Sequence, residues 1–508
     1  MFADSVDSDI APSGTLLGLL QRGRGDGTLH ALAAPRAEAL AALGQCLRHD
    51  PRRDWRLEHR SLYYARLHRD LDAGLDDLED HLFDPADLVD TGEERTGLAL
   101  SVLGHLASYG DRGALLLLRR YAARGANWRW ALDELAVRDD DAGLRSLGPA
   151  VLARFPRTPE GDAELAAAVR DAFEPRPWRL WAEDPGRPGQ AERIGRAGEA
   201  GSFDRWQRQL RPAGPRPGWS VRAVLEWAQD GSPEPPGSPD AGGRTPQQRE
   251  AAAVRCLAAV AGPEDRPELL AAARGGPGIA RAVALRHLAE RGDADVLDLI
   301  EAAAAHSPAS CAVPTDPADG PDPADGPGET VARAALAAFS RMRTTAAVDR
   351  ARRWARREDG LGAAAAAMLA VRGGRQDGPL VLTGLRRAVR AQGPDSGALG
   401  PLLDGAARLT VHCAAPVVRY VYRETASSHL RGRAARALAV TDPSFAAGCA
   451  VECLWDCEES TRELAARHAA TGDARVVERL RRLAADPAEE EGVQSAVRGR
   501  LGPGEPAR

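Results

Sequence analysis

The stretch Ala282-Val-Ala-Leu-Arg-His-Leu288-Ala-Glu-Arg-Gly292-Asp293-Ala-Asp-Val296 decides the fold of this chain. Before Gly292, Ala and Leu recur at the spacing that places them on one face of a helix, and a second apolar face starts at Val296. Glycine can adopt the left-handed conformation that ends a helix, and the Asp after it can accept hydrogen bonds from the free N–H groups of the next helix. The stretch therefore predicts two helices joined by a tight turn.

The same phrase recurs along the chain. Several steps between copies are 29 or 30 residues long, for example from Gly110 to Asp139 and from Gly262 to Gly292. Neither helix of such a pair can bury its apolar face alone, so neighbouring pairs must stack. Good helix formers are abundant, whereas aromatic and β-branched residues are sparse. We therefore predict an all-α, right-handed α-solenoid of helical hairpins, whose seven copies of the phrase start at Ala107, Ala136, Ala259, Ala289, Ala370, Ala439 and Ala469.

Breaks in the helical pattern indicate the organisation of the chain. Pro- and Gly-rich stretches interrupt it between the two repeat blocks, and two tandem copies of Asp-Pro-Ala-Asp-Gly-Pro interrupt the second block. We predict a partly disordered N-terminus (1–35), an N-terminal helical block (36–173), an irregular helical segment (174–246) that ends in a linker (231–246), C-terminal repeats (247–499) with a disordered loop (307–328), and a disordered tail (500–508).

Composition argues against several classes of function. All 67 basic residues are Arg, which we attribute to GC-rich coding, and the lack of Lys excludes a lysine-based phosphate loop or Schiff base. No Gly-x-Ser-x-Gly elbow or His-Glu-x-x-His pattern is present. The net charge is only −6, seven cysteines do not imply a disulfide framework, and we find neither an apolar leader nor a membrane-length apolar run. We expect a cytoplasmic protein without enzymatic activity, cofactor or membrane contact.

The phrase resembles the HEAT-repeat family of armadillo-like α-solenoids, over roughly residues 95–173 and 246–499. Actinobacterial members of this family have the same Ala- and Arg-rich texture. The resemblance implies a scaffold or adaptor that binds a protein or peptide on its solenoid surface. Other HEAT-like proteins are DNA-alkylation-repeat glycosylases or lyases that handle bilin pigments. A nucleic-acid-binding solenoid and a small-molecule lyase therefore remain as alternatives.

Trp128, Trp130 and Asp133 form the first candidate binding site. DNA-alkylation-repeat glycosylases hold a damaged base with Trp and Asp on a concave face, and these three residues are similar in type. Their spacing is not a close match, and the acidic run 139–141 is unfavourable for phosphate. Packing in the core or in a groove is the alternative interpretation.

An Arg-rich run from Arg341 to Arg357 gives the second candidate site, with Arg350, Arg353, Trp354 and Arg357 as its binding residues. Such a run could bind phosphate or an acidic peptide, and the alternative is a solvated helix face.

Cys449, Cys453 and Cys457 lie four residues apart, which would place them near one face of a helix. Structural zinc sites have turns between their ligands, so we expect small buried residues and no metal here.

Overall fold

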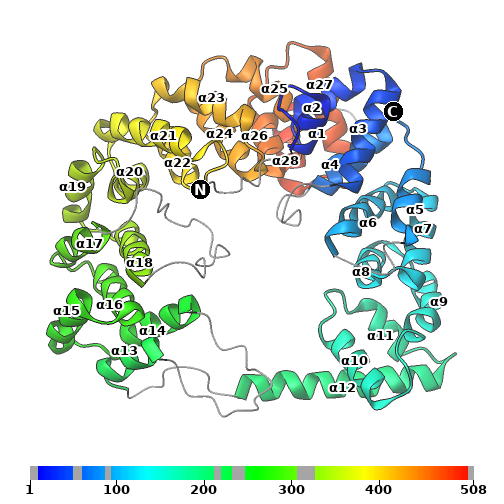
Figure 1. The fold of residues 1–508 in the computed structure, drawn as a ribbon. Coiled ribbons are helices and arrows are strands. Elements are labelled where there is room, and N and C mark those ends of the chain that lie inside the picture. The colour runs from blue at the N-terminus through cyan, green and yellow to red at the C-terminus, as the bar shows by residue number, and fades with distance from the viewer. Residues whose placement is uncertain are drawn as a thin grey trace. The chain divides into compact units, whose positions relative to one another are not determined.

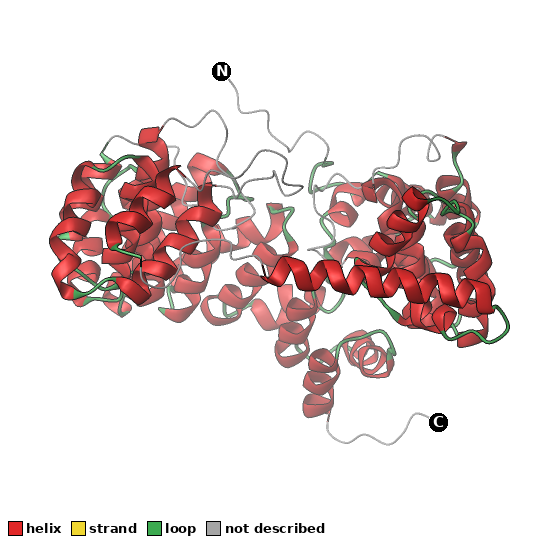
Figure 2. Ribbon diagram, turned by 90° about the horizontal axis from the view of Figure 1, so that it is seen from below, coloured by secondary structure: helices red, strands yellow, loops and turns green. Residues whose placement is uncertain are grey.

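The computed structural model describes residues 10–49, 60–85, 93–210, 219–230, 246–305 and 327–501. Within these ranges all regular structure is helical (Figures 1 and 2). The predicted all-α class is confirmed. No helix in these ranges is long and apolar enough to cross a membrane.

The chain divides into two compact units, and one of them combines both ends of the sequence. Unit 1 comprises Met1–Arg211, Ala426–Gly432 and Ser444–Arg508, and unit 2 comprises Pro212–Thr425 and Arg433–Pro443. The predicted linker 231–246 and loop 307–328 lie outside the described residues, except for Pro246 and for residues 327–328, which begin helices. The segment 500–508 likewise lies outside them beyond residue 501.

Unit 1 contains the N-terminal helices and the last four helices of the chain. Within segment 1–35, which was expected to be partly disordered, the described residues form two helices. The helices of unit 1 are α1 (Leu16–Gln21), α2 (Gly25–Ala33), α3 (Arg36–Arg48), α4 (Arg60–Asp70), α5 (Asp76–Leu82), α6 (Glu93–Ser108), α7 (Arg112–Arg124), α8 (Trp128–Arg138), α9 (Asp141–Leu152), α10 (Pro159–Arg170), α11 (Arg176–Ala182), α12 (Pro188–Leu210), α25 (Cys449–Cys453), α26 (Glu459–His468), α27 (Ala474–Ala485) and α28 (Glu491–Leu501).

Unit 2 contains the middle of the chain, and its last helix, α24 (Ser428–Thr441), starts in a stretch that belongs to unit 1. Its other helices are α13 (Val221–Asp230), α14 (Pro246–Val260), α15 (Arg266–Gly275), α16 (Gly278–Glu290), α17 (Val296–Ala304), α18 (Pro327–Arg341), α19 (Thr345–Trp354), α20 (Gly360–Arg372), α21 (Gly378–Gln392), α22 (Leu399–Arg408) and α23 (Ala415–Glu424).

The turn expected from the repeated phrase forms at some of its copies. Gly110 and Gly292 have φ angles of +88° and +75°, the left-handed conformation. Asp111 then caps α7, because its Oδ1 accepts a hydrogen bond from the N–H of Ala114 at 3.1 Å. The expectation is wrong at Gly262, which has a φ angle of −90°. There the chain enters a 3₁₀ turn instead.

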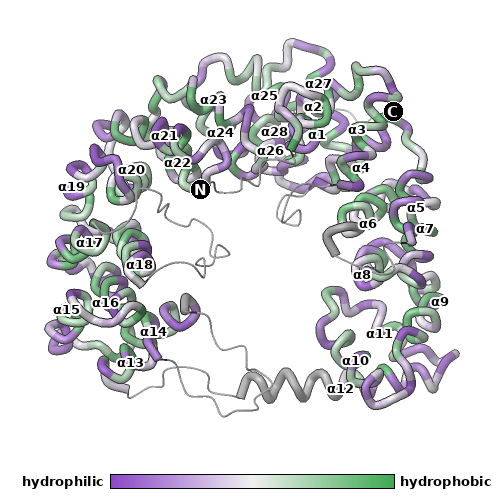
Figure 3. The backbone as a smooth tube through the Cα atoms, viewed as in Figure 1, coloured by the Kyte–Doolittle hydropathy of each residue, from purple (hydrophilic) through white to green (hydrophobic). Residues whose placement is uncertain are grey.

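Apolar faces of successive helices pack against each other within each unit, and hydropathy alternates along the helices (Figure 3). Leu288 on α16 is 3% exposed, and Val296 and Ile300 on α17 are fully buried, as the spacing predicted. Helices α20 and α22 approach closely at Gly405, where a Cβ atom would lie 2.4 Å from the Cβ of Ala370. The absence of a side chain there allows the two helices to meet.

Arginines bond to helix C-termini that lie earlier in the sequence. Arg408 at the end of α22 donates to the carbonyl oxygens of Ala370 at 2.9 Å and Gly373 at 2.9 Å, at the end of α20. The last carbonyls of a helix have no partner within it, and a positive charge near them is favourable. Further donors of this kind are Arg154, Arg176, Arg291 and Arg500, which bond to carbonyls at Gly125, Ala136, Ala261 and Ala466.

Candidate functional site

A cavity of about 730 Å³ lies in unit 1 beside α8. It lies between α8, the end of α10 and the segment that leads into α11. Trp128, Trp130 and Asp133, the first candidate site, all line it. Its remaining lining residues are Asn127, Arg129, Leu132, Glu134, Val137, Arg138, Ala168, Asp171, Ala172, Phe173, Glu174 and Trp178.

Trp128 belongs to both the core and the cavity wall. Its ring packs edge-on against Phe155 and Trp178, with centroid distances of 5.8 and 6.3 Å. Arg154 lies over the same ring, 5.5 Å from its centroid. The two interpretations of this tryptophan, core packing and groove lining, therefore both apply.

Trp130 is held by a chain of hydrogen bonds at the cavity wall. Its indole N–H donates to Ser101 Oγ at 3.0 Å, and the Ser101 hydroxyl donates to Glu134 at 2.7 Å. Glu134 also forms an ion pair with Arg138 at 2.6 Å, one helical turn further on. Burial raises the pKa of Glu134, while Arg138 and the hydrogen bonds act in the opposite direction. Glu134 thus holds Trp130 in the cavity wall through Ser101, and Arg138 balances its negative charge.

Asp133 is in a different situation from its neighbour Glu134. Its Oδ1 accepts a hydrogen bond from the backbone N–H of Glu174 at 3.2 Å. Among the described residues it has no ion-pair partner within 4.0 Å. Burial raises its pKa to about 6, and the nearby carboxylates of Glu174 and Glu134 add to this effect. Ionisation of Asp133 is therefore less favourable in the folded protein than in water.

The rim of the cavity is apolar and exposed. Phe173, in the turn between α10 and α11, is 83% exposed, and Val137 near the end of α8 is 63% exposed. Large apolar side chains at the edge of an aromatic cavity indicate an interaction site more strongly than the same side chains scattered singly.

Sequence reasoning missed the residues that come from the segment 168–178. The stretch Glu174-Pro-Arg-Pro-Trp178 is a visible signal, because its prolines end one helix and start the next. Nothing in the sequence indicates that this turn lies over α8, since that contact joins residues about 40 positions apart.

The second candidate site is largely paired within unit 2. Arg350 on α19 bonds to Asp298 at 2.8 Å, and Arg357 bonds to Asp359 at 2.7 Å and to Glu301 at 3.1 Å. These partners compete with any external phosphate for the guanidinium groups. Trp354 is buried against Phe339, with ring centroids 4.9 Å apart. Arg353 remains exposed.

The three cysteines do not share one helix. Helix α25 ends at Cys453, and Cys457 lies beyond it, where its backbone N–H donates to the carbonyl of Gly23 at 3.0 Å. The prediction of one continuous helix is therefore wrong, and Cys457 instead contacts the start of the chain. Within the described ranges, no group of three or more His, Cys, Asp or Glu residues is placed to hold a metal ion.

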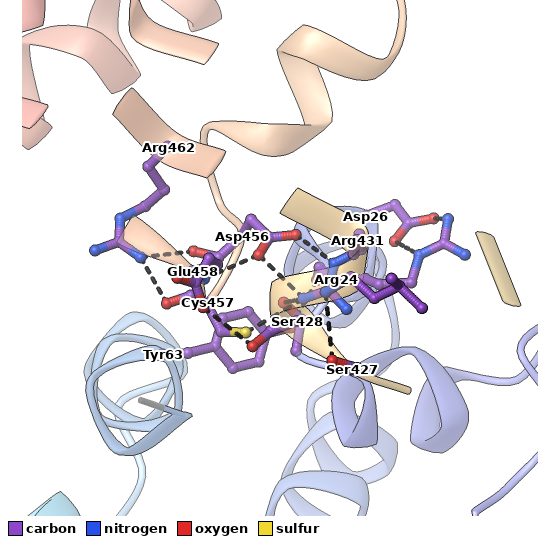
Figure 4. A network of polar contacts seen from close by, with 12 residues as sticks. Arg24, Asp26, Tyr63, Ser427, Ser428, Arg431, Asp456, Cys457, Glu458 and Arg462 are labelled. Carbon is purple, nitrogen blue, oxygen red and sulfur yellow. Dashed lines mark hydrogen bonds and ion pairs between the residues drawn. The ribbon is translucent and has the colours of Figure 1, made fainter. Parts of the chain in front are cut away.

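Cys457 belongs to a buried polar network in unit 1 (Figure 4). The fully buried guanidinium of Arg431 binds both carboxylate oxygens of Asp456, at 2.7 and 3.0 Å, and also donates to the carbonyl of Gly23 at 3.2 Å. Arg431 and Gly23 are 408 positions apart. The network attaches the start of the chain to its last helices, and we assign it a structural role.

Arg66 forms a second, largely buried contact between the N-terminal helices and the last helices of the chain. It extends from α4 to Asp486 at 2.8 Å and to Glu489 at 3.0 Å. Glu489 is also bound by Arg462 at 2.7 Å. Although burial raises the pKa of Glu489, Arg462 and Arg66 hold it at about 2. The carboxylate of Glu489 is therefore ionised at neutral pH and already paired with two arginines. Because these partners occupy it, the cavity beside α8 is the stronger candidate for a binding site.

Compared with models of known protein families and with curated protein sequences, the chain matches none of them.

Proposed function

We propose that this chain is a right-handed α-solenoid of HEAT-like hairpins without enzymatic activity, and that its cavity beside α8 binds a peptide segment of a partner protein. The repeated phrase, its resemblance to HEAT repeats and the stacked helices support the scaffold interpretation.

The observation that carries the proposal is the combination of an exposed apolar rim with an aromatic wall. Phe173 and Val137 are left in water beside Trp130 and Trp178. Binding energy at protein interfaces concentrates in apolar and aromatic anchors that fill pockets, and this cavity is large enough for at least one such side chain. A bound segment would remove the rim residues from water.

Nucleic acid is the less favoured partner. Asp133, Asp171 and Glu174 line the cavity and would repel a phosphate backbone, whereas Arg138 is engaged by Glu134. Arg350 and Arg357 are likewise paired with carboxylates, which argues against the Arg-rich run as a site for phosphate.

The test is selection of peptides from a random displayed library on the full chain, followed by measurement of the Kd of the enriched peptides. We expect Val137→Asn to weaken binding at least about tenfold, because it replaces an apolar side chain at the rim with a neutral polar one that loses its water on binding. Peptides that bind both proteins equally, or a library that yields no binder, would contradict the proposal.

Val371→Asn is the matched control. Val371 occupies the same position of the repeated phrase as Val137 and is similarly exposed, at 56% against 63%, but does not line the cavity. The control variant should bind the selected peptides as the parent does.

A further inference from the structure

The carboxylates of the cavity differ in how their charge is matched. Glu134 is paired with Arg138, and Asp171 is paired with Arg170 at 2.8 Å. Asp133 has only the backbone N–H of Glu174 as a hydrogen-bond donor, and neither Asp133 nor Glu174 has an ion-pair partner among the residues that the structure describes. Two carboxylates without an ion-pair partner among the described residues therefore lie next to each other at the cavity.

Among the residues that line the cavity, Arg129 is the cation that acts on Asp133, but its guanidinium group lies over an aromatic ring. Arg129 is exposed, and its guanidinium lies over the ring of Trp128, 5.4 Å from the centroid. Its effect on Asp133 is smaller than that of burial. The negative potential at Asp133 and Glu174 is thus left for a ligand to neutralise.

Aromatic rings line the same cavity as these carboxylates. Trp130, Trp178 and Phe173 line the cavity, and the indole N–H of Trp130 is already used by Ser101. Rings attract cations at their faces, and the attraction grows when the cation leaves water. An aromatic cavity with unmatched carboxylates is complementary to an organic cation with an apolar stem.

We propose that the cavity receives a positively charged side chain, Arg or Lys, of the bound peptide, with the carboxylate of Asp133 as its counter-ion and the aromatic rings as its walls. This inference rests on the proposed function and specifies its ligand. Glu174 supplies a second carboxylate, which suits the planar guanidinium group better than the compact ammonium group.

The test uses four short probes on the full chain labelled with 5-fluorotryptophan. The probes are acetyl-Gly-Gly-X-Gly-Gly-amide, with X as Arg, its neutral isostere citrulline, Lys, or the neutral norleucine. Fluorine resonances of Trp130 and Trp178, assigned through Trp→Phe variants, report binding at the cavity. We expect the cationic probes to shift these resonances with a Kd at least about tenfold lower than their neutral counterparts.

Asp133→Asn should sharply reduce the difference between Arg and citrulline, since the amide keeps the acceptor for the Glu174 N–H and loses the charge, while Glu174 remains. Glu164→Gln is the matched control. It removes one negative charge from an exposed position on α10 that does not line the cavity, and should keep the difference.

The outcomes separate this inference from the proposed function. Equal binding of charged and neutral probes, or no shift with any cationic probe, overturns the cation site, whereas library peptides that depend on Val137 would still support peptide binding. Binding of alkylated duplex DNA that shifts the same resonances overturns both the peptide ligand and the scaffold interpretation. Tighter binding of the Arg probe than of the Lys probe would indicate that Glu174 supplies the second carboxylate to the guanidinium group.

Discussion

Asp133 on α8 accepts a hydrogen bond from the backbone N–H of Glu174, at 3.2 Å. This contact attaches the turn after α10 to α8 and at the same time brings the carboxylates of both residues to one cavity. The hydrogen bond therefore stabilises the local fold, while repulsion between the two carboxylates destabilises it. An arrangement of this kind is typical of binding sites, where stability is given up for recognition.

Asp133→Asn should stabilise the protein. The pKa of Asp133 is about 6 in the folded chain and 3.8 ordinarily, so the folded state holds this proton more tightly. Stability therefore falls as pH rises from about 4 to 6, and the full penalty remains above that window. We expect the variant to melt about 2 °C higher at pH 7.5, which corresponds to about 1 kcal/mol once solvent screening is allowed for. The gain should vanish near pH 4, and a variant that melts below the parent at pH 7.5 would contradict this.

Binding of the Arg probe should depend on pH. A bound cation lowers the pKa of Asp133, so the affinity is greatest above about pH 6 and falls as Asp133 becomes protonated. The other charged groups at the cavity are Arg129, Glu134, Arg138, Asp171 and Glu174. Calorimetric titrations from pH 7.5 down to 4.5 should show a loss of about tenfold for the Arg probe and little change for the citrulline probe. A flat profile for the Arg probe would count against Asp133 as the counter-ion.

Arg408→Lys should destabilise unit 2 although the charge is kept. Arg408 binds carbonyls of both Ala370 and Gly373 with its planar guanidinium group, and an ammonium group cannot reproduce that geometry. We expect a loss of about 1–2 kcal/mol in the free energy of unfolding, measured by urea denaturation. Arg353→Lys, at an exposed position on α19, is the control and should be neutral. Equal stability of the two variants would show that the helix-end contacts contribute nothing.

Asp456→Asn should be far more damaging than the same change at the surface. It leaves the fully buried guanidinium of Arg431 without its carboxylate, at a cost of about 3–5 kcal/mol. Asp473→Asn removes an exposed ion-pair partner of Arg475 and should leave the stability nearly unchanged. Limited proteolysis of the Asp456 variant should release the N-terminal helices first, because the Arg431 network holds Gly23. A variant that resists both denaturant and protease like the parent would contradict the structural role of the network.

The periodic pattern was sufficient to predict the helices and much of the buried face. Leu288 and Val296 lie where their spacing placed them, and Gly110 and Gly292 close their helices as expected. These features depend on residues within one or two turns, which is the range over which sequence patterns report.

Contacts between distant parts of the chain could not be predicted from local sequence patterns. Nothing near Gly23 indicates that its carbonyl is bound by Arg431, and Cys457 appeared to continue a helix that in fact ends at Cys453. The arginine content was attributed to coding composition, yet Arg408 shows that guanidinium groups join the ends of helices.

The sequence indicated only some of the residues that line the cavity. Trp128, Trp130 and Asp133 are candidates because their types are similar to the base-binding residues of DNA-alkylation-repeat glycosylases, and the structure places all three at one cavity. Phe173 and Glu174 come from a turn whose position over α8 depends on packing. The second group, Arg350 and Arg357, is bound by Asp298, Glu301 and Asp359, partners that no local pattern reveals.

The most direct test of the central claim is to locate a bound peptide by photo-crosslinking. A library-selected peptide that carries a diazirine next to its cationic residue would be irradiated with the full chain, and the modified residues would be mapped by mass spectrometry. The account predicts crosslinks within 127–138 and 168–178, the two segments that line the cavity, and their loss in Val137→Asn but not in Val371→Asn. Crosslinks concentrated elsewhere, for instance on α19 and α20, would contradict it.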